Sequence, residues 1–150
     1  MEKHTEKKGA LIIATTLLAT IALICYNHDG QTKPTLEDFF TAIATVESNN
    51  DTMAQGADGE IGAMQIMPAY WLDSIEYRDI GGTHFDCYSR EYSKMIMEGY
   101  FRRYAENAWL AEDWHSLARI HHGGWNGMNR KHTKQYADRV IAIMEVQNNG

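Results

Sequence analysis

Cysteine and proline are both rare in this chain of 150 residues, which contains two of each. Cys25 lies inside an apolar run and Cys87 stands alone in the body of the sequence, so we expect no disulfide within the chain. Without cross-links, the fold must be held by the packing of apolar side chains. Because 44% of the residues are apolar, we expect one domain with a modest core.

Basic residues are also in deficit, with 14 Lys and Arg against 20 Asp and Glu and a formal net charge of -6. The bases are interspersed with acids along the chain, whereas binding to a phosphate backbone needs a clustered basic surface. Nucleic acid is therefore not an expected partner. The chain also lacks internal repeats, low-complexity segments and any long stretch of alternating apolar and polar residues, so no extended sheet is expected.

One long uncharged segment, residues 9–26, reads GALIIATTLLATIALICY and follows three lysines. Its length and basic flank predict a membrane anchor with the N-terminus in the cytoplasm. A cleaved signal segment is the alternative, but its best cleavage site, after Ala22, would leave an apolar stub. We therefore expect a cytoplasmic tail over 1–8, an anchor over 9–26, a linker over 27–34 and an extracytoplasmic domain over 35–150. The membrane of a virion would suit the same arrangement.

Within that domain, apolar residues recur at helical spacing. Thr35 and Asp38 form a capping-box pattern, and the apolar stripe that follows predicts a helix ending near Ser48. Other helices are predicted over 67–75, 89–104, 112–122 and from about 133 onward. The glycine-containing loop over 51–62 can hold a short hairpin around Asp58. The expected fold is mainly α, with at most that small β element.

Glu47 follows Val46 on the apolar stripe, close to the C-terminal end of the first predicted helix. The negative end of the helix dipole opposes a carboxylate, and partial burial disfavours its charge, so both should raise the pKa of Glu47. A carboxylic acid that keeps its proton near neutral pH can protonate a glycosidic oxygen. A solvated Glu in a helix-ending turn fits the same local sequence, so its position alone does not decide.

The wider pattern around Glu47 consists of several spaced motifs. They are Glu47-Ser48, the loop with Gly59 and Gly62, and the stretch MQIMP over 64–68. At similar spacing, this pattern resembles the motifs of the lytic transglycosylase family. The segment ARIHHGG over 118–124 takes the place of its Tyr-Asn-x-Gly motif, and TKQY over 133–136 resembles its closing Thr-x-x-Tyr. The resemblance spans about residues 36–144. It implies a lysozyme-like fold and cofactor-free cleavage of the MurNAc-GlcNAc β-1,4 bond of peptidoglycan, with Glu47 as general acid and base and 1,6-anhydro ends as products.

Invertebrate-type lysozymes offer a second resemblance. Their Gln-Ile-x-x-x-Tyr-Trp-x-Asp motif matches 65–73, and their Ala-Arg-Ile-His-x-Gly-Gly-x-x-Gly segment matches 118–127, although those enzymes are rich in disulfides. They use a second carboxylate, for which Asp58 is the candidate, with Asp51 and Glu60 behind it. An Asp before Gly is also an ordinary turn residue. The alternative function is thus a hydrolytic lysozyme with Glu47 as the acid and Asp58 as the second carboxylate.

The resemblances also imply a substrate-binding set, comprising Ser48, Met64, Gln65, His121, His122, Gly123 and Tyr136. In this set, Gln65 is either a ligand for an N-acetyl group or a satisfied core amide, and Tyr136 is expected to direct its hydroxyl toward Glu47. The histidines show no ligand spacing for zinc, so no metal is expected. The four tryptophans suit either the core or the faces of sugars.

Two further classes of function remain open at this level. A wall-binding or assembly protein of a virion, secretion or conjugation complex could keep the fold without turnover. A membrane-active peptide is also conceivable, but residues 9–26 lack an amphipathic basic face. The short linker restricts an anchored domain to nearby wall, which suits local opening for such a complex.

Overall fold

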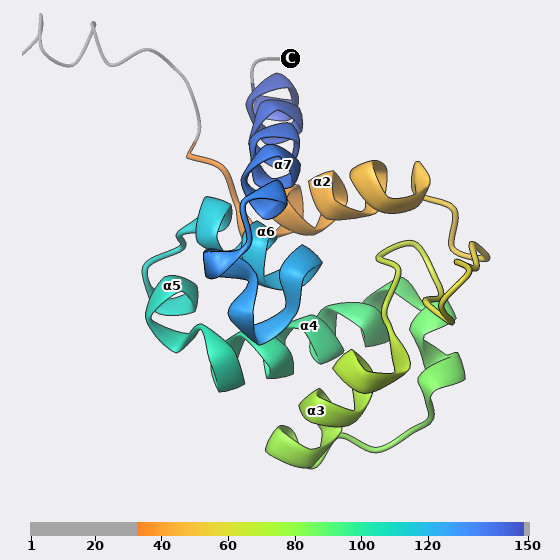
Figure 1. The fold of residues 1–150 in the computed structure, drawn as a ribbon. Coiled ribbons are helices and arrows are strands. Elements are labelled where there is room, and N and C mark those ends of the chain that lie inside the picture. Colours follow the sequence, from red (N-terminus) through yellow and green to blue (C-terminus); the bar gives the residue numbers. More distant parts are fainter. Residues whose placement is uncertain (1–32, 149–150) are drawn as a thin grey trace, which may run out of the picture. The chain divides into compact units, whose positions relative to one another are not determined.

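The computed structural model describes residues 33–148, which form mainly helices and no strands (Figure 1). The expectation of a mainly α domain is confirmed. No helix among the described residues is long and apolar enough to cross a membrane. The predicted tail over 1–8, the anchor over 9–26 and most of the linker over 27–34 lie outside the described residues.

Helix α2, Leu36–Ser48, begins with the predicted capping box. The Thr35 N–H donates to Asp38 Oδ2 at 2.7 Å, and the Asp38 N–H donates to Thr35 Oγ1 at 3.2 Å. Two backbone donors at the helix start are thereby satisfied, which is typically worth about 1 kcal/mol. The helix ends at Ser48, and the next residue, Asn49, has a φ of 55° that reverses the chain. Glu47 therefore stands in the last turn, as predicted.

The other helices follow in the predicted order. They are α3 (Pro68–Arg78), α4 (Arg90–Tyr104), α5 (Glu106–Leu110), α6 (Trp114–Gly123) and α7 (His132–Asn148), with the 3-10 helices η1 (His84–Tyr88) and η2 (Gly124–Asn129). The side chains of Ser89 and Asp113 cap α4 and α6, at the positions where the predicted helices over 89–104 and 112–122 begin. Helix α5 and both 3-10 helices were not predicted.

Figure 1 shows α4 crossing the middle of the domain, with α3 on one side of it and α2 and α7 on the other. Helix α3 packs on α4, and α7 packs on both α2 and α6. Gly99 allows the close approach of α3, because a Cβ there would lie 3.2 Å from the Ser74 Cβ. Aromatic rings fill the centre, where Phe39 contacts Phe101 at 6.0 Å and stacks on Trp114 at 5.2 Å between ring centres. Burial of such rings supplies much of the stability of the fold.

The loop between α2 and α3 contains two isolated antiparallel bridges, Gln55–Ile61 and Ile61–Ile66. The β element near Asp58 is thus smaller than a hairpin of two named strands. Gly62 has a φ of 77°, and a Cβ there would lie 2.1 Å from the Cys87 carbonyl oxygen. Only glycine fits this position, so the loop is held tightly against η1.

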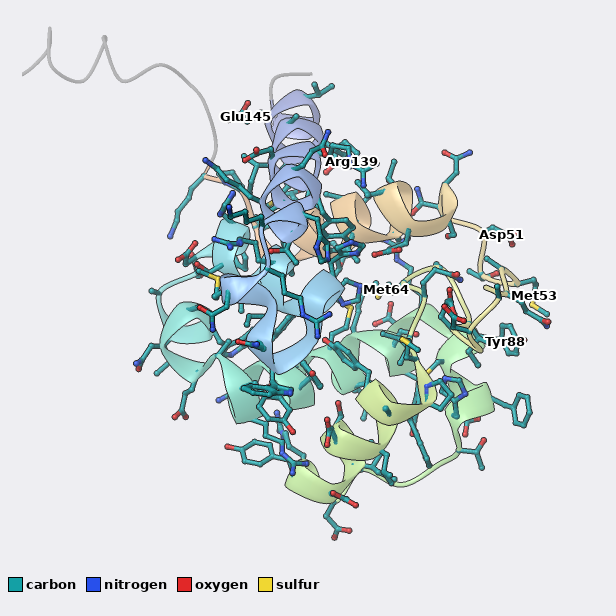
Figure 2. All side chains as sticks on the ribbon, in the orientation of Figure 1. Asp51, Met53, Met64, Tyr88, Arg139 and Glu145 are labelled. Atoms are coloured by element: carbon teal, nitrogen blue, oxygen red, sulfur yellow. The ribbon has the colours of Figure 1, made fainter. Side chains whose placement is uncertain are left out.

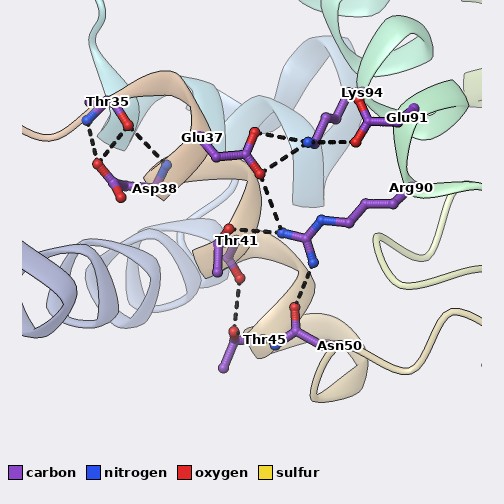
Figure 3. Close-up of polar contacts among 9 residues, drawn as sticks. All are labelled: Thr35, Glu37, Asp38, Thr41, Thr45, Asn50, Arg90, Glu91 and Lys94. Carbon is purple, nitrogen blue, oxygen red and sulfur yellow. Dashed lines mark hydrogen bonds and ion pairs between the residues drawn. The ribbon is translucent and has the colours of Figure 1, made fainter.

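A polar network fastens α2 to α4 (Figure 3). Lys94 Nζ of α4 donates to Glu37 Oε2 of α2 at 2.8 Å. Arg90 donates to Thr41 Oγ1 and to Asn50 Oδ1, each at 2.8 Å. These bonds join the start of α2 and the turn after its end to α4.

Candidate active site

A cavity of about 460 Å³ opens beside the last turn of α2. Its wall is built from α2, the following loop, α3, α4, α6 and η2. Among the residues lining it are Glu47, Glu60, Gln65, Tyr70, His121 and Trp125. The cavity thus brings together segments from the first and last thirds of the domain, and its volume lies in the range of ligand sites in proteins.

Glu47 is held by a hydrogen bond from α7. The Tyr136 hydroxyl donates to Glu47 Oε1 at 2.6 Å. Burial raises the pKa of Glu47 above its usual value, and the charge of Glu60 raises it further. The hydrogen bond from Tyr136 and the more distant charge of Arg139 oppose this shift without cancelling it. Glu47 is therefore a carboxylic acid with an increased hold on its proton, and the predicted orientation of Tyr136 is confirmed.

Tyr136 is fixed in turn by its neighbours. Its ring stacks on His122 at 4.2 Å between centres with an interplanar angle of 5°, and the Arg139 guanidinium lies 5.7 Å from the ring centre. Burial raises the pKa of Tyr136 well above its usual value, and the nearby Glu47 adds to that effect. The phenol consequently stays protonated and acts as the donor to Glu47.

His121 of α6 contributes an uncharged group to the site. Its side chain is only 3% exposed, and its Nε2 lies 3.6 Å from Glu47 Oε1, beyond hydrogen-bond distance. Burial, with a smaller contribution from His122, lowers the pKa of His121 to about 3. The imidazole is thus neutral near Glu47 and supplies no counter-charge that would favour loss of the Glu47 proton.

The predicted substrate-binding residues divide into two groups. The residues that line the cavity are Gln65, His121, His122 and Gly123. Those that support its wall from behind are Ser48, Met64 and Tyr136. Ser48 Oγ donates to the Ala63 carbonyl at 2.9 Å, which ties the loop to α2, and Met64 is fully buried. Figure 2 shows Met64 near the middle of the domain and Met53 at the outer edge of the loop.

The sequence offers three carboxylates as partners of Glu47, namely Asp51, Asp58 and Glu60. Asp58 and Asp51 are exposed and do not belong to the residues lining the cavity, whereas Glu60 does. Glu60 Oε2 also accepts from the Asp58 N–H at 3.0 Å, so its side chain stabilises the turn that contains Asp58. Glu60 lies next to the buried Ile61 in an extended segment. Neighbouring side chains of an extended segment point to opposite faces, so Glu60 faces away from the core that buries Ile61. This is the one sequence signal that could have placed the Glu60 side chain on the cavity side.

Some residues of the cavity wall were not predicted as site residues. Tyr70 and Tyr100 stack at 3.7 Å between ring centres, and Tyr70 meets His121 edge to face at 5.5 Å. The hydroxyl of Tyr70 is buried and has no hydrogen-bond partner among the described residues. Asp73 and Arg130 add one acidic and one basic side chain to the wall. The site therefore combines aromatic surface with a few polar groups, which is typical of small-molecule sites in proteins.

No cluster of three or more His, Cys, Asp or Glu side chains that could hold a metal ion occurs within residues 33–148. Comparison of the chain with protein-family profiles, curated proteins and solved structures finds no match.

Proposed function

We propose that this protein cleaves the β-1,4 bond between MurNAc and GlcNAc in the glycan strands of peptidoglycan, as a lytic transglycosylase. The observation that carries the proposal is the Glu47 carboxyl, which lines an open cavity and has a raised pKa because of burial. Protonation of a glycosidic oxygen needs such an acid. The motifs around Glu47, which resemble those of lytic transglycosylases, supply the substrate class.

Because of the hydrogen bond from Tyr136, the two carboxyl oxygens of Glu47 have different roles. Oε1 accepts from the Tyr136 hydroxyl at 2.6 Å, so the acidic proton belongs on Oε2. In the first step this proton moves to the bridging oxygen and the bond from that oxygen to the sugar C1 breaks. The Tyr136 hydrogen bond then stabilises the new Glu47 carboxylate, which makes the proton transfer easier.

In the second step the Glu47 carboxylate removes the proton of the 6-hydroxyl of the same sugar. The 6-oxygen bonds to C1, a 1,6-anhydro ring forms and Glu47 regains its proton. No water is consumed and no second carboxylate is required. The exposed position of Asp58 outside the cavity wall agrees with this one-acid mechanism.

Hydrolysis is the second candidate, and Glu60 is the observation that favours it. Glu60 lines the same cavity and is close enough for its charge to raise the pKa of Glu47. Two carboxyl groups that flank a glycosidic bond define a hydrolase of the lysozyme type. In that case Glu60 takes the part that the sequence had assigned to Asp58, water is consumed and the products carry reducing ends.

Product mass from purified peptidoglycan tests both candidates. We expect the full-length chain to release fragments with anhydro ends, each lighter by one water than a reducing end, and Glu47→Gln to release them at a rate lower by roughly 10²-fold or more. Products with reducing ends would show that the reaction is hydrolysis and not transglycosylation. Loss of those products in Glu60→Gln or in Asp58→Asn would identify the second carboxylate. Wall binding without release by either the wild type or Glu47→Gln would make this a binding or assembly protein.

We also propose that residues 9–26 anchor the protein in a membrane, with the domain on the extracytoplasmic side or on a virion. An anchored cleaving domain suits local opening of the wall for a virion, secretion or conjugation complex. Detergent-dependent extraction together with an intact N-terminus would support an uncleaved anchor, whereas a shortened, freely soluble chain would contradict it.

A further inference from the structure

Trp125 differs from the other three tryptophans of the chain. Trp71, Trp109 and Trp114 pack against the hydrophobic core, whereas the Trp125 side chain is 67% exposed. Trp125 also lines the cavity that contains Glu47. Trp125 makes no ring contact within residues 33–148, and its exposure leaves the indole accessible to a ligand. An exposed indole in a cavity wall indicates a contact surface for a ligand.

The backbone that carries Trp125 is firmly held. A Cβ on Gly124, the residue before Trp125, would lie 3.4 Å from the Tyr100 hydroxyl, so this turn lies close to α4. Farther along η2, a Cβ on Gly127 would lie 2.1 Å from the Arg119 carbonyl oxygen, which shows how closely η2 packs on α6. Arg119 Nη2 also donates to the Met128 carbonyl at 2.6 Å. The indole thus projects from a braced turn, and little backbone order has to be gained when a ligand binds.

The chemistry of this wall fits a pyranose ring. The face of an indole carries partial negative charge and attracts the polarised C–H groups on the flat face of a sugar. Asp73 and Arg130 line the same cavity and offer an acceptor and donors for hydroxyl and acetamido groups. Asp73 is itself held in place by Arg103, with 3.4 Å between Asp73 Oδ1 and Arg103 Nη1.

We propose that Trp125 is the stacking platform for an N-acetylhexosamine ring next to the bond that Glu47 protonates. This inference rests on the proposed function for the identity of the glycan. The platform contributes the same stacking before and during bond cleavage. Its loss should therefore raise KM and leave kcat nearly unchanged.

Binding of a soluble peptidoglycan tetrasaccharide to the full-length Glu47→Gln chain tests the platform without turnover. We expect Trp125→Ala to weaken the affinity roughly tenfold, the equivalent of about 1.4 kcal/mol, and Trp125→Tyr to keep most of it. Phe85→Ala is the matched control, because Phe85 is 74% exposed on η1 and does not belong to the cavity wall. It should bind like the parent chain. Calorimetry gives the affinities. Peptidoglycan turnover by the Trp125 and Phe85 variants that keep Glu47 gives kcat and KM.

The outcomes separate this inference from the proposed function. An affinity and a KM unchanged in Trp125→Ala, or no binding of the tetrasaccharide by the parent chain, would overturn the platform. Glu47-dependent cleavage with no effect at Trp125 would overturn the platform alone. Trp125-dependent binding in a chain that never cleaves peptidoglycan would support the platform and reject the proposed function.

Discussion

Helix α2 carries two glutamates, Glu37 near its start and Glu47 near its end, in opposite environments. Glu37 has a side chain that is 61% exposed and lies 2.8 Å from the ammonium of Lys94. Glu47 has a side chain that is 19% exposed and accepts its short hydrogen bond from the neutral phenol of Tyr136. The helix dipole favours a negative charge at the first position and opposes it at the second.

The difference shows that the surroundings decide which glutamate can act as an acid. At Glu37, burial of Lys94 opposes its charge, but hydrogen bonds to Glu37 and Glu91 outweigh burial and raise the pKa of Lys94. The Lys94 ammonium therefore keeps its charge beside Glu37. At Glu47 the nearest nitrogen heterocycle, His121, is neutral. Burial there favours the protonated carboxyl, which can give up a proton to a substrate.

The largest expected effect comes from removing the acid. Glu47→Gln keeps the shape of the side chain but has no proton to donate, so peptidoglycan cleavage should fall roughly 10²- to 10⁴-fold. Glu37→Gln is the matched control on the same helix and should cleave at the wild-type rate. Release of muropeptides measures both. Equal losses in the two variants would show that α2, not the acid, had been disturbed.

Tyr136→Phe should have the next largest effect. Without the hydroxyl, the carboxylate formed after proton transfer loses a hydrogen bond, and such bonds to charged groups are worth about 1.5–3 kcal/mol, or roughly 10- to 100-fold in rate. Because this bond lowers the pKa of Glu47, its removal should also move the alkaline limb of the pH–rate profile to higher pH. A slower variant with an unshifted profile would assign Tyr136 to packing alone.

A smaller effect concerns stability and pH. The pKa of Glu47 is raised in the folded state, so the folded chain binds more protons than the unfolded chain between the two pKa values. Stability should consequently fall as pH rises through that window and then level off. Glu47→Gln should remove this dependence and melt a few degrees above the wild type at neutral pH. Melting curves of both chains between acidic and neutral pH provide the check, and parallel curves would contradict it.

The smallest effect is expected at the other glutamate. Glu37→Gln breaks an ion pair whose carboxylate is largely exposed, and such pairs contribute about 0.2–1 kcal/mol, less at high salt. We expect a loss at the low end of that range, measured by denaturant unfolding at low and high ionic strength. If the free energy of unfolding fell by several kcal/mol and this loss did not depend on salt, the network in Figure 3 would be shielded from solvent like a buried ion pair.

Helix α2 and the position of its acid could be predicted because the determinants are local. The capping box lies within four residues of chain, and the apolar stripe that places Glu47 lies within one helix. Helix α5 could not be found in this way, because none of its residues is buried and it therefore has no stripe. Its order depends on its neighbours α4 and α6.

The cavity wall depended on contacts between distant parts of the chain. Whether Asp58 or Glu60 faces Glu47 is set by the path of the loop, and the close fit of Gly62 against Cys87 determines that path. Nothing within the loop sequence records this contact. Trp125 follows Gly124, whose φ of 70° redirects the chain out of α6, and only the fold shows that this turn faces the cavity.

Helix α2 is fastened at both ends to different partners, through Glu37 to α4 and through Glu47 to α7. The number of residues between those two fixed points is therefore under constraint, whatever their identity. One residue inserted between Thr41 and Val46 would turn Glu47 by about 100° and shift it by about 1.5 Å relative to Glu37. Substitutions on the exposed side of α2 are tolerable. A change in the length of α2 would break either the Glu47–Tyr136 hydrogen bond or the Glu37–Lys94 ion pair.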